Sequence, residues 1–187
     1  MVAGGGVLWL AMAARGLAPV DLVGTTRVGE RREPNAVVWL EGVAASGREA
    51  PKAVLDQRNL AFNPRVLAVR VGTTVEFPNR DRVFHNVFSF HEGKRFDLGM
   101  YPVGTVKHVT FGQKGLSRIF CNIHPNMAAY IMAVDSEYFA VSDPSGRFVL
   151  AGVPSGTYVY HAWHPGGAIL TGSAAVDGDK PLEVRWP

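Results

Sequence analysis

The chain is built from short runs rich in Val, Phe, Tyr and Thr, separated by turns that contain Gly or Pro. It has 21 glycines and 12 prolines among 187 residues, and no stretch carries a long helical pattern. Before residue 135 the runs predict strands at 36–40, 65–71, 73–77, 85–90, 106–111, 116–121 and 129–134. Strands of this length, with turns at this spacing, predict an all-β fold, specifically a β-sandwich.

The residues after Asp135 differ slightly in character. Two turns, DPSG and VPSG, are each followed by a strand-like run, and LEVRW is the last such run. About 50 residues of β-meander are marginal as an independent domain. We therefore expect this part to pack on the first unit or to recruit an earlier strand, and the run AVVWLEG at 36–42 is a candidate.

The first residues read MVAGGGVLWLAMAARGLA. The apolar run from Val2 to Ala14 is short for a bilayer span but suits an export signal, with small residues at 14–18 for cleavage. The usual positive charge before the run is missing, so an uncleaved anchor or a buried segment remain alternatives. We expect export, to the periplasm. The excess of 19 Lys and Arg over 16 Asp and Glu is too small to indicate nucleic-acid binding.

The single cysteine lies in RIFCNIHPNM, with His124 and Met127 at three-residue steps after Cys121. One cysteine excludes an internal disulfide. Thiolate and thioether ligands beside an imidazole select copper, and a trigonal copper site needs a second histidine. His85, in FPNRDRVFHNV, is the best candidate, because the start of its strand can lie beside the end of the strand that carries Cys121. A buried small hydrophobe would explain Cys121 alone, but not the histidine and methionine in register.

These segments resemble the cupredoxins, the small blue copper proteins. The shared pattern of plastocyanins and amicyanins is Phe62-x-Pro64, Val69, Gly72, Val75, Phe77, Asn79 and His85-Asn86-Val87, followed by Cys-x-x-His-x-x-Met with the amicyanin spacing. The resemblance covers roughly residues 55 to 135, and Phe84, where a proline is common, is a departure from it. The whole chain resembles methylamine-utilisation-like cupredoxins, and its last part is similar to the carboxypeptidase regulatory-like, transthyretin-like β-sandwich.

The resemblance implies a cupredoxin Greek-key β-sandwich plus a smaller C-terminal transthyretin-like β-sandwich unit. The expected division is 1–18, a signal or anchor; 19–53, a leading strand and linker, with membership of the C-terminal β-unit as an alternative; 54–136, the cupredoxin domain; and 137–187, the carboxypeptidase regulatory-like C-terminal unit. One type 1 copper ion is expected, with His85, Cys121 and His124 as its trigonal ligands and Met127 as a weak axial ligand. By resemblance, the Asn86 side chain ties the His85 loop to the Cys121 loop.

The expected function is a periplasmic carrier of single electrons between redox proteins. The partner would be a dehydrogenase or c-type cytochrome that docks near His124. A copper module for storage, delivery or sensing is the alternative, and a structural or adhesive role is a third. Enzyme activity is not expected, since no nucleophile with a base and no HxH pair is visible. His161 and His164 could bind a second metal, but their spacing in a strand places them on opposite faces.

Overall fold

The computed structural model describes residues 18–44, 47, 52–90 and 93–187. The expected export segment therefore lies outside the described residues, apart from Ala18. The described part contains strands, turns and loops but no helix, and so it offers no helical segment that could cross a membrane.

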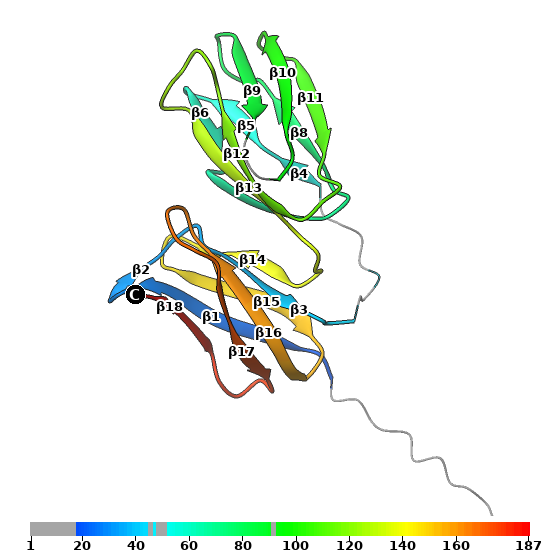
Figure 1. Ribbon diagram of the computed structural model, residues 1–187, viewed down its shortest axis with the longest axis vertical. Coiled ribbons are helices and arrows are strands. Elements are labelled where there is room, and N and C mark those ends of the chain that lie inside the picture. Colours follow the sequence, from blue (N-terminus) through cyan, green and yellow to red (C-terminus); the bar gives the residue numbers. More distant parts are fainter. Residues whose placement is uncertain (1–17, 45–46, 48–51, 91–92) are drawn as a thin grey trace, which may run out of the picture.

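The strands form two units, one above the other in Figure 1. The upper one, called the site unit below, comprises residues 52–90 and 93–135. Its strands are β4 (Ala53–Val54), β5 (Asp56–Arg58), β6 (Ala61–Asn63), β7 (Val66–Arg70), β8 (Thr74–Pro78), β9 (His85–Ser89), β10 (Phe96–Tyr101), β11 (Val106–Thr110), β12 (Gly115–Phe120) and β13 (Ala128–Val134).

The lower one, called the companion unit, comprises residues 18–44 and 136–187. Its strands are β1 (Val20–Val28), β2 (Arg31–Arg32), β3 (Val37–Glu41), β14 (Phe139–Val141), β15 (Arg147–Val153), β16 (Gly156–Trp163), β17 (Leu170–Val176) and β18 (Leu182–Trp186). One sheet has the order β15-β1-β18, with β2 paired to β1, and the other has the order β14-β3-β16-β17.

In the site unit, a five-stranded sheet of order β10-β9-β12-β13-β7 faces the smaller sheet β11-β8-β4 and the β5-β6 hairpin. Alternate side chains of these strands point inward, as period-two burial in β8 and β12 shows. They enclose one core that includes Phe77, Tyr101, Phe111 and Ile119, and Cys121 belongs to the same buried cluster. Close-packed apolar side chains of this core therefore hold the cysteine in place.

The companion unit has its own core, which includes Leu40, Leu150, Ala162 and Trp186. Strand β3 lies between β14 and β16, so a strand that precedes the linker in sequence completes a sheet of the later residues. A third cluster joins the units: Val66 and Met132 of the site unit pack with Val37 and Trp163 of the companion unit. The two sandwiches thus share buried apolar surface, which stabilises their association.

The predicted fold class is confirmed: the described chain is all-β and built of sandwiches. All seven predicted runs are strands, with ends that differ by one residue or less from the observed ones. The domain boundaries stay a prediction, as does the transthyretin-like character of the C-terminal unit.

Candidate metal centre

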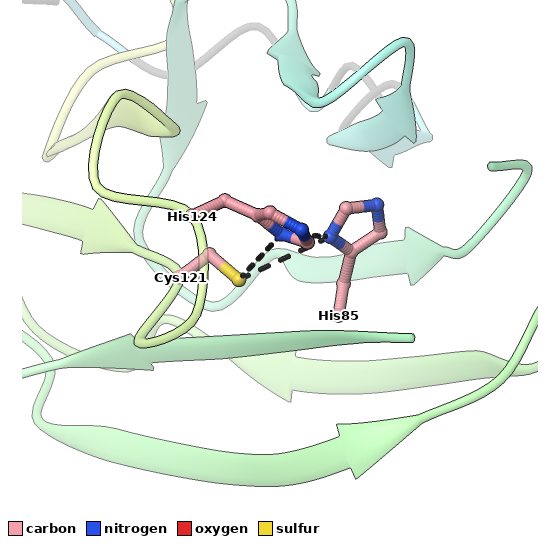
Figure 2. Close-up of side chains that lie close together, drawn as sticks. All are labelled: His85, Cys121 and His124. Carbon is pink, nitrogen blue, oxygen red and sulfur yellow. Dashed lines mark hydrogen bonds between the residues drawn. The ribbon is translucent and has the colours of Figure 1, made fainter. Parts of the chain in front are cut away.

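Two neighbouring strands bring the first two candidate ligands together. Strand β12 runs antiparallel to β9, with Phe120 opposite Phe88. The start of β9 and the end of β12 therefore lie at the same edge of the sheet. His85 is the first residue of β9, and Cys121 directly follows β12. Figure 2 shows both side chains pointing to the same space, which the His124 ring closes from the following loop.

The three side chains present one nitrogen or sulfur atom each to a common centre. His85 Nδ1 lies 3.1 Å from His124 Nδ1 and 3.9 Å from Cys121 Sγ, and Cys121 Sγ lies 3.5 Å from His124 Nδ1. His85 and Cys121 are buried, whereas His124 is partly exposed. Among the described residues, this is the one group of three or more His, Cys, Asp or Glu whose ligand atoms converge in this way.

These separations suit a single metal ion. An ion bound at about 2.0–2.3 Å by nitrogen and sulfur in a trigonal plane holds those atoms about 3.5–4.0 Å apart. The two separations from Cys121 Sγ, 3.5 and 3.9 Å, lie within that range, and the separation between the two Nδ1 atoms, 3.1 Å, lies below it. One thiolate and two imidazoles are also the ligand set that favours copper among the common metals. The residues present therefore fit one copper ion, without a large rearrangement of the loops.

The loop that carries Cys121 and His124 is closed by its own backbone. The Cys121 N–H donates to the Met127 carbonyl at 3.3 Å, and the Met127 N–H donates to the His124 carbonyl at 2.9 Å. Met127 is buried in the same apolar cluster as Cys121. The methionine thus anchors the loop in the core, on the side where β13 begins. Its expected role as an axial ligand stays a prediction.

The site unit has the arrangement that the resemblance to cupredoxins implies: a sandwich, a histidine and a cysteine on neighbouring strands, and a short loop back to a second histidine. The specific methylamine-utilisation-like subgroup stays a prediction.

Proteins similar to about half of this chain are found among solved structures. No family model matches the chain, and no curated protein matches it. Among solved structures, a purple cupredoxin from Nitrosopumilus maritimus is 25% identical, covers 44% of this chain and 100% of its own, and has a TM-score of 0.41. A mutant amicyanin in its reduced state, at 25% identity, covers 54% and 99%, with a TM-score of 0.41.

A copper-containing nitrite reductase from Thermus scotoductus SA-01 is also similar, at 26% identity and a TM-score of 0.43. It covers 49% of this chain but only 25% of its own. The candidate metal centre rests on the geometry of the described residues, namely the sheets and the three converging side chains.

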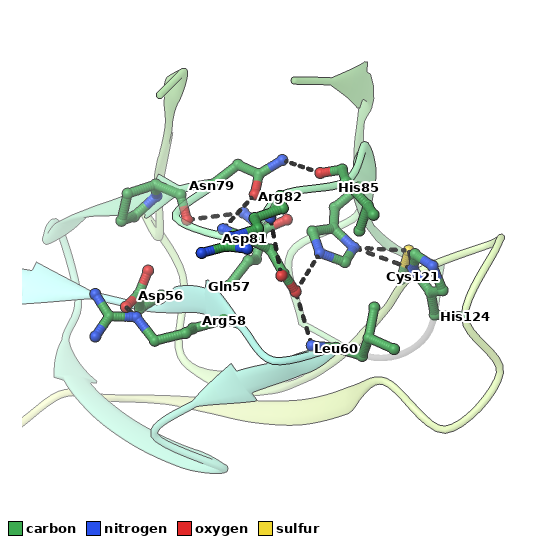
Figure 3. Close-up of polar contacts among 12 residues, drawn as sticks. Asp56, Gln57, Arg58, Leu60, Asn79, Asp81, Arg82, His85, Cys121 and His124 are labelled. Carbon is green, nitrogen blue, oxygen red and sulfur yellow. Dashed lines mark hydrogen bonds and ion pairs between the residues drawn. The ribbon is translucent and has the colours of Figure 1, made fainter. Parts of the chain in front are cut away.

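The His85 ring has a second polar neighbour, which sequence reasoning missed. His85 Nε2 lies 3.1 Å from the Asp81 carboxylate (Figure 3). The N–H of Leu60 holds the pKa of the Asp81 carboxyl below its ordinary value, helped by hydrogen bonds from His85 and from the Arg82 N–H, while burial acts in the opposite direction. A carboxylate behind a metal-binding imidazole is a common way to fix its ring. The only sequence signal was an acidic residue four positions before the histidine.

Asn79 shapes the loop that delivers Asp81. Its side-chain amide donates to the carbonyls of Val83 and Tyr101, at 2.9 and 3.0 Å, and its oxygen accepts the Asp81 N–H at 3.0 Å. Asn79 is fully buried, so these three bonds satisfy an otherwise costly polar group. The asparagine in FPNRD therefore ties β8 to the loop that ends at His85.

Asn86 does not have the partner expected for it. Its amide donates at 2.7 Å to Asp97, in β10, and no hydrogen bond from its side chain to the Cys121 loop is present among the described residues. Its own side-chain oxygen is buried without a partner. Strand β10 pairs with β9 here, with Met100 opposite Asn86, and Asp97 precedes Met100 across a register shift. In this structure Asn86 thus links the His85 strand to β10.

A buried polar network supports β8 below the site. Gln57 donates to the Tyr101 hydroxyl at 2.5 Å and to the Pro78 carbonyl at 3.1 Å, and the Tyr101 hydroxyl donates to the Phe77 carbonyl at 3.1 Å. Burial raises the pKa of Tyr101 far above its ordinary value, so its hydroxyl stays a neutral donor. The network joins β5, β8 and β10 at the end of the sandwich that carries the site.

The two histidines of the companion unit do not form a second site. His161 lies between the Glu41 carboxylate, at 2.7 Å, and the Thr171 hydroxyl, at 2.9 Å. His164 lies against the Trp186 ring and within 3.3 Å of Glu33. Each histidine thus has its own separate surroundings, and His164 lies just beyond the end of β16.

Proposed function

We propose that this chain is a type 1 copper protein that carries single electrons between redox proteins. The observation that carries the proposal is the convergence of one sulfur and two imidazole nitrogens, all within 4.8 Å of one another, on loops fixed by a close-packed core. A bound copper ion would supply reversible one-electron exchange.

The residues of the chain supply the rigidity that such exchange needs. Cys121 is fixed by the core beneath it, His85 by its strand and its Asp81 contact, and His124 by the Cys121–Met127 loop. None of these supports depends on a side chain that is free to rotate into solvent. The three ligand atoms would therefore stay close to one arrangement in both oxidation states, which lowers the reorganisation that accompanies each transfer.

The surface around the site suits a protein partner. His124 is partly exposed, and the loops around it carry the exposed apolar side chains Leu60, Val83, Phe84 and Ile123. Leu60 donates its N–H to Asp81, and Ile123 directly precedes His124, so these side chains border the site itself. Exposed apolar groups that adjoin one another mark interaction surfaces. We propose that a dehydrogenase or c-type cytochrome docks here, with His124 as the contact nearest the metal.

The proposed location is the periplasm. The support is the apolar N-terminal segment of the sequence, which lies outside the described residues. We propose a carrier rather than an enzyme, because the described residues hold one converging ligand cluster and no second one that could serve as a separate catalytic metal site.

A copper module for storage, delivery or sensing is the second candidate, since a thiolate with two imidazoles also binds Cu(I). Metal retention through redox cycles separates the two functions. The copper-loaded protein is reduced and reoxidised repeatedly in the presence of a Cu(I) chelator, and bound copper is counted after each cycle. A carrier keeps its copper and its one-electron wave in voltammetry. Loss of the metal to the chelator on the first reduction would overturn the carrier function in favour of delivery.

A further inference from the structure

The His85 ring is held at both of its nitrogens. Its side chain is completely buried, with Nδ1 facing His124 and Cys121 and Nε2 facing Asp81 at 3.1 Å (Figure 3). Rotation of the ring by 180° about its Cβ–Cγ bond would place Cδ2 instead of Nδ1 toward the cluster and Cε1 instead of Nε2 toward Asp81. The carboxylate contact opposes that rotation.

The Asp81 carboxylate is itself fixed by the backbone. One of its oxygens accepts the Leu60 N–H at 2.7 Å, and the other accepts the Arg82 N–H at 2.9 Å. The Leu60 N–H comes from the two-residue turn between β5 and β6, where Asn59 and Leu60 have φ values of 55° and 57°. A leucine rarely adopts a positive φ, so this turn maintains an uncommon backbone conformation while its N–H points to Asp81.

Hydrogen-bond chemistry then assigns the ring hydrogen. An ionised carboxylate is an acceptor only, so the nitrogen that faces it must carry the hydrogen. The neutral imidazole has one N–H, which leaves the lone pair on Nδ1, the nitrogen that faces Cys121 and His124.

We propose that Asp81 is a positioning residue for the metal centre: it holds His85 as the Nε2–H tautomer with Nδ1 directed at the metal, and its negative charge favours oxidised over reduced copper. The second part rests on the proposed function. An anionic acceptor behind an imidazole makes the ring a stronger donor, and stronger donation stabilises Cu(II), the more highly charged ion, more than Cu(I).

The first test needs no metal. In the metal-free protein labelled with ¹⁵N, the shifts and couplings of the His85 ring nitrogens show which one carries the hydrogen. The expected result is Nε2–H in the wild-type protein and in Asp81→Asn, whose amide oxygen still accepts, and a mixture of tautomers in Asp81→Ala. A wild-type ring with its hydrogen on Nδ1 would overturn the positioning role.

The second test separates charge from geometry. Asp81→Asn keeps an acceptor but removes the charge, so Cu(II) affinity is expected to fall about 10–100-fold. If the fold-loss of Cu(I) affinity is ten times smaller than the fold-loss of Cu(II) affinity, the midpoint potential rises by about 59 mV. Asp143→Asn is the matched control, because Asp143 also accepts backbone N–H bonds in a turn, but in the companion unit. It is expected to leave both affinities and the potential unchanged.

Asp81→Ala removes the acceptor of both the Leu60 and the Arg82 N–H groups. The copper measurements therefore use Asp81→Asn, after circular dichroism has established that it folds. A wild-type potential in Asp81→Asn would overturn the charge effect while the proposed function stands. A wild-type protein that forms no stable copper couple would overturn the proposed function, and the metal-free tautomer would then decide the inference by itself.

Discussion

His85 in the site unit and His161 in the companion unit each lie against a carboxylate, yet only His85 belongs to a candidate metal centre. In the site unit, the His85 side chain is 0% exposed and lies 3.1 Å from Asp81. In the companion unit, the His161 side chain is 20% exposed and lies 2.7 Å from Glu41, a carboxylate that is 64% exposed. The shorter contact is the one without converging ligands.

The difference lies at the opposite side of each ring. His85 Nδ1 faces a sulfur and a second imidazole, whereas His161 Nδ1 faces the Thr171 hydroxyl. One face of His161 also stacks on the Trp39 ring, at 5.2 Å between centroids. A histidine–carboxylate pair is thus a general way to satisfy a ring nitrogen, and converging soft ligands within a dry core are what make it part of a metal site.

The largest expected effect comes from removing each ring in turn. We expect His85→Gln to lower copper affinity by more than about 100-fold, since losing a ligand costs more than losing an outer-shell partner. His161→Gln is the matched control and should bind copper as the wild type does. Competition titrations with a chromophoric chelator measure both affinities. Equal losses of copper affinity in His85→Gln and His161→Gln would contradict the difference between the two histidine–carboxylate pairs.

The contact between the units gives the next largest effect. Trp163 of β16 packs against Tyr130 of β13, with ring centroids 5.3 Å apart, and against Met132. Trp163→Ala should lower the free energy of unfolding by about 3–5 kcal/mol, because it leaves a large cavity in this shared cluster. Denaturant titration followed by circular dichroism measures the loss. Ile169→Ala, at an exposed position, is the control and should change stability little.

A smaller effect is expected from the network beneath the metal centre. Tyr101→Phe removes the donor to the Phe77 carbonyl and one of the two acceptors of Gln57, and both groups are buried. The expected loss is about 1–3 kcal/mol, the usual cost of a buried group left without its partner. Thr74→Val, which breaks an exposed hydrogen bond to Thr110, is the comparison and should cost less. Equal thermal shifts would show that the network contributes nothing special.

The smallest expected effect is on the stability of the fold at low pH. Hydrogen bonds, first from the Ser145 hydroxyl and then from the Arg147 N–H, hold the pKa of Asp143 below its ordinary value of 3.8. A carboxyl with a lowered folded-state pKa stabilises the fold above its unfolded-state pKa, and this contribution disappears as the pH falls through the folded-state value. Asp143→Asn should therefore lose less stability than the wild type between pH 6 and pH 2.5 in urea titrations. An identical loss would contradict the assignment.

Much of the fold could be predicted from the sequence because its strands carry a regular pattern. Runs such as TTVEF and VKHVTF alternate as half-buried strands do, and the structure confirms them as β8 and β11. Strand β10 was not predicted from the sequence. Gly99, at φ 63°, and a register shift between Asp97 and Met100 interrupt its alternation of side chains. Strand β1 contains Gly24, although glycine disfavours strands. A Cβ at this position would lie 2.2 Å from the Phe148 ring, so a tertiary contact explains the glycine.

The site residues that lie close together in the sequence could be predicted from their spacing. Those that only the fold brings to the site could not. Cys121 and His124 lie three residues apart, and His85 could be inferred from the start of its strand, whereas the axial role of Met127 stays a prediction. Asp81 and Gln57 depend on a loop conformation and on the β5–β6 hairpin, neither of which leaves a periodic signal. The Asn86 partner was wrong for the same reason, since the position of Asp97 depends on the irregular strand β10.

The central claim is that His85, Cys121 and His124 enclose one copper ion with a thiolate ligand. The most direct measurement is the visible absorption and electron paramagnetic resonance spectrum of the Cu(II)-loaded protein, with Cys121→Ser as the control. We predict an intense visible thiolate-to-copper band at one copper per chain, which is absent from Cys121→Ser. A colourless Cu(II) protein, or a band that survives in Cys121→Ser, would contradict the account.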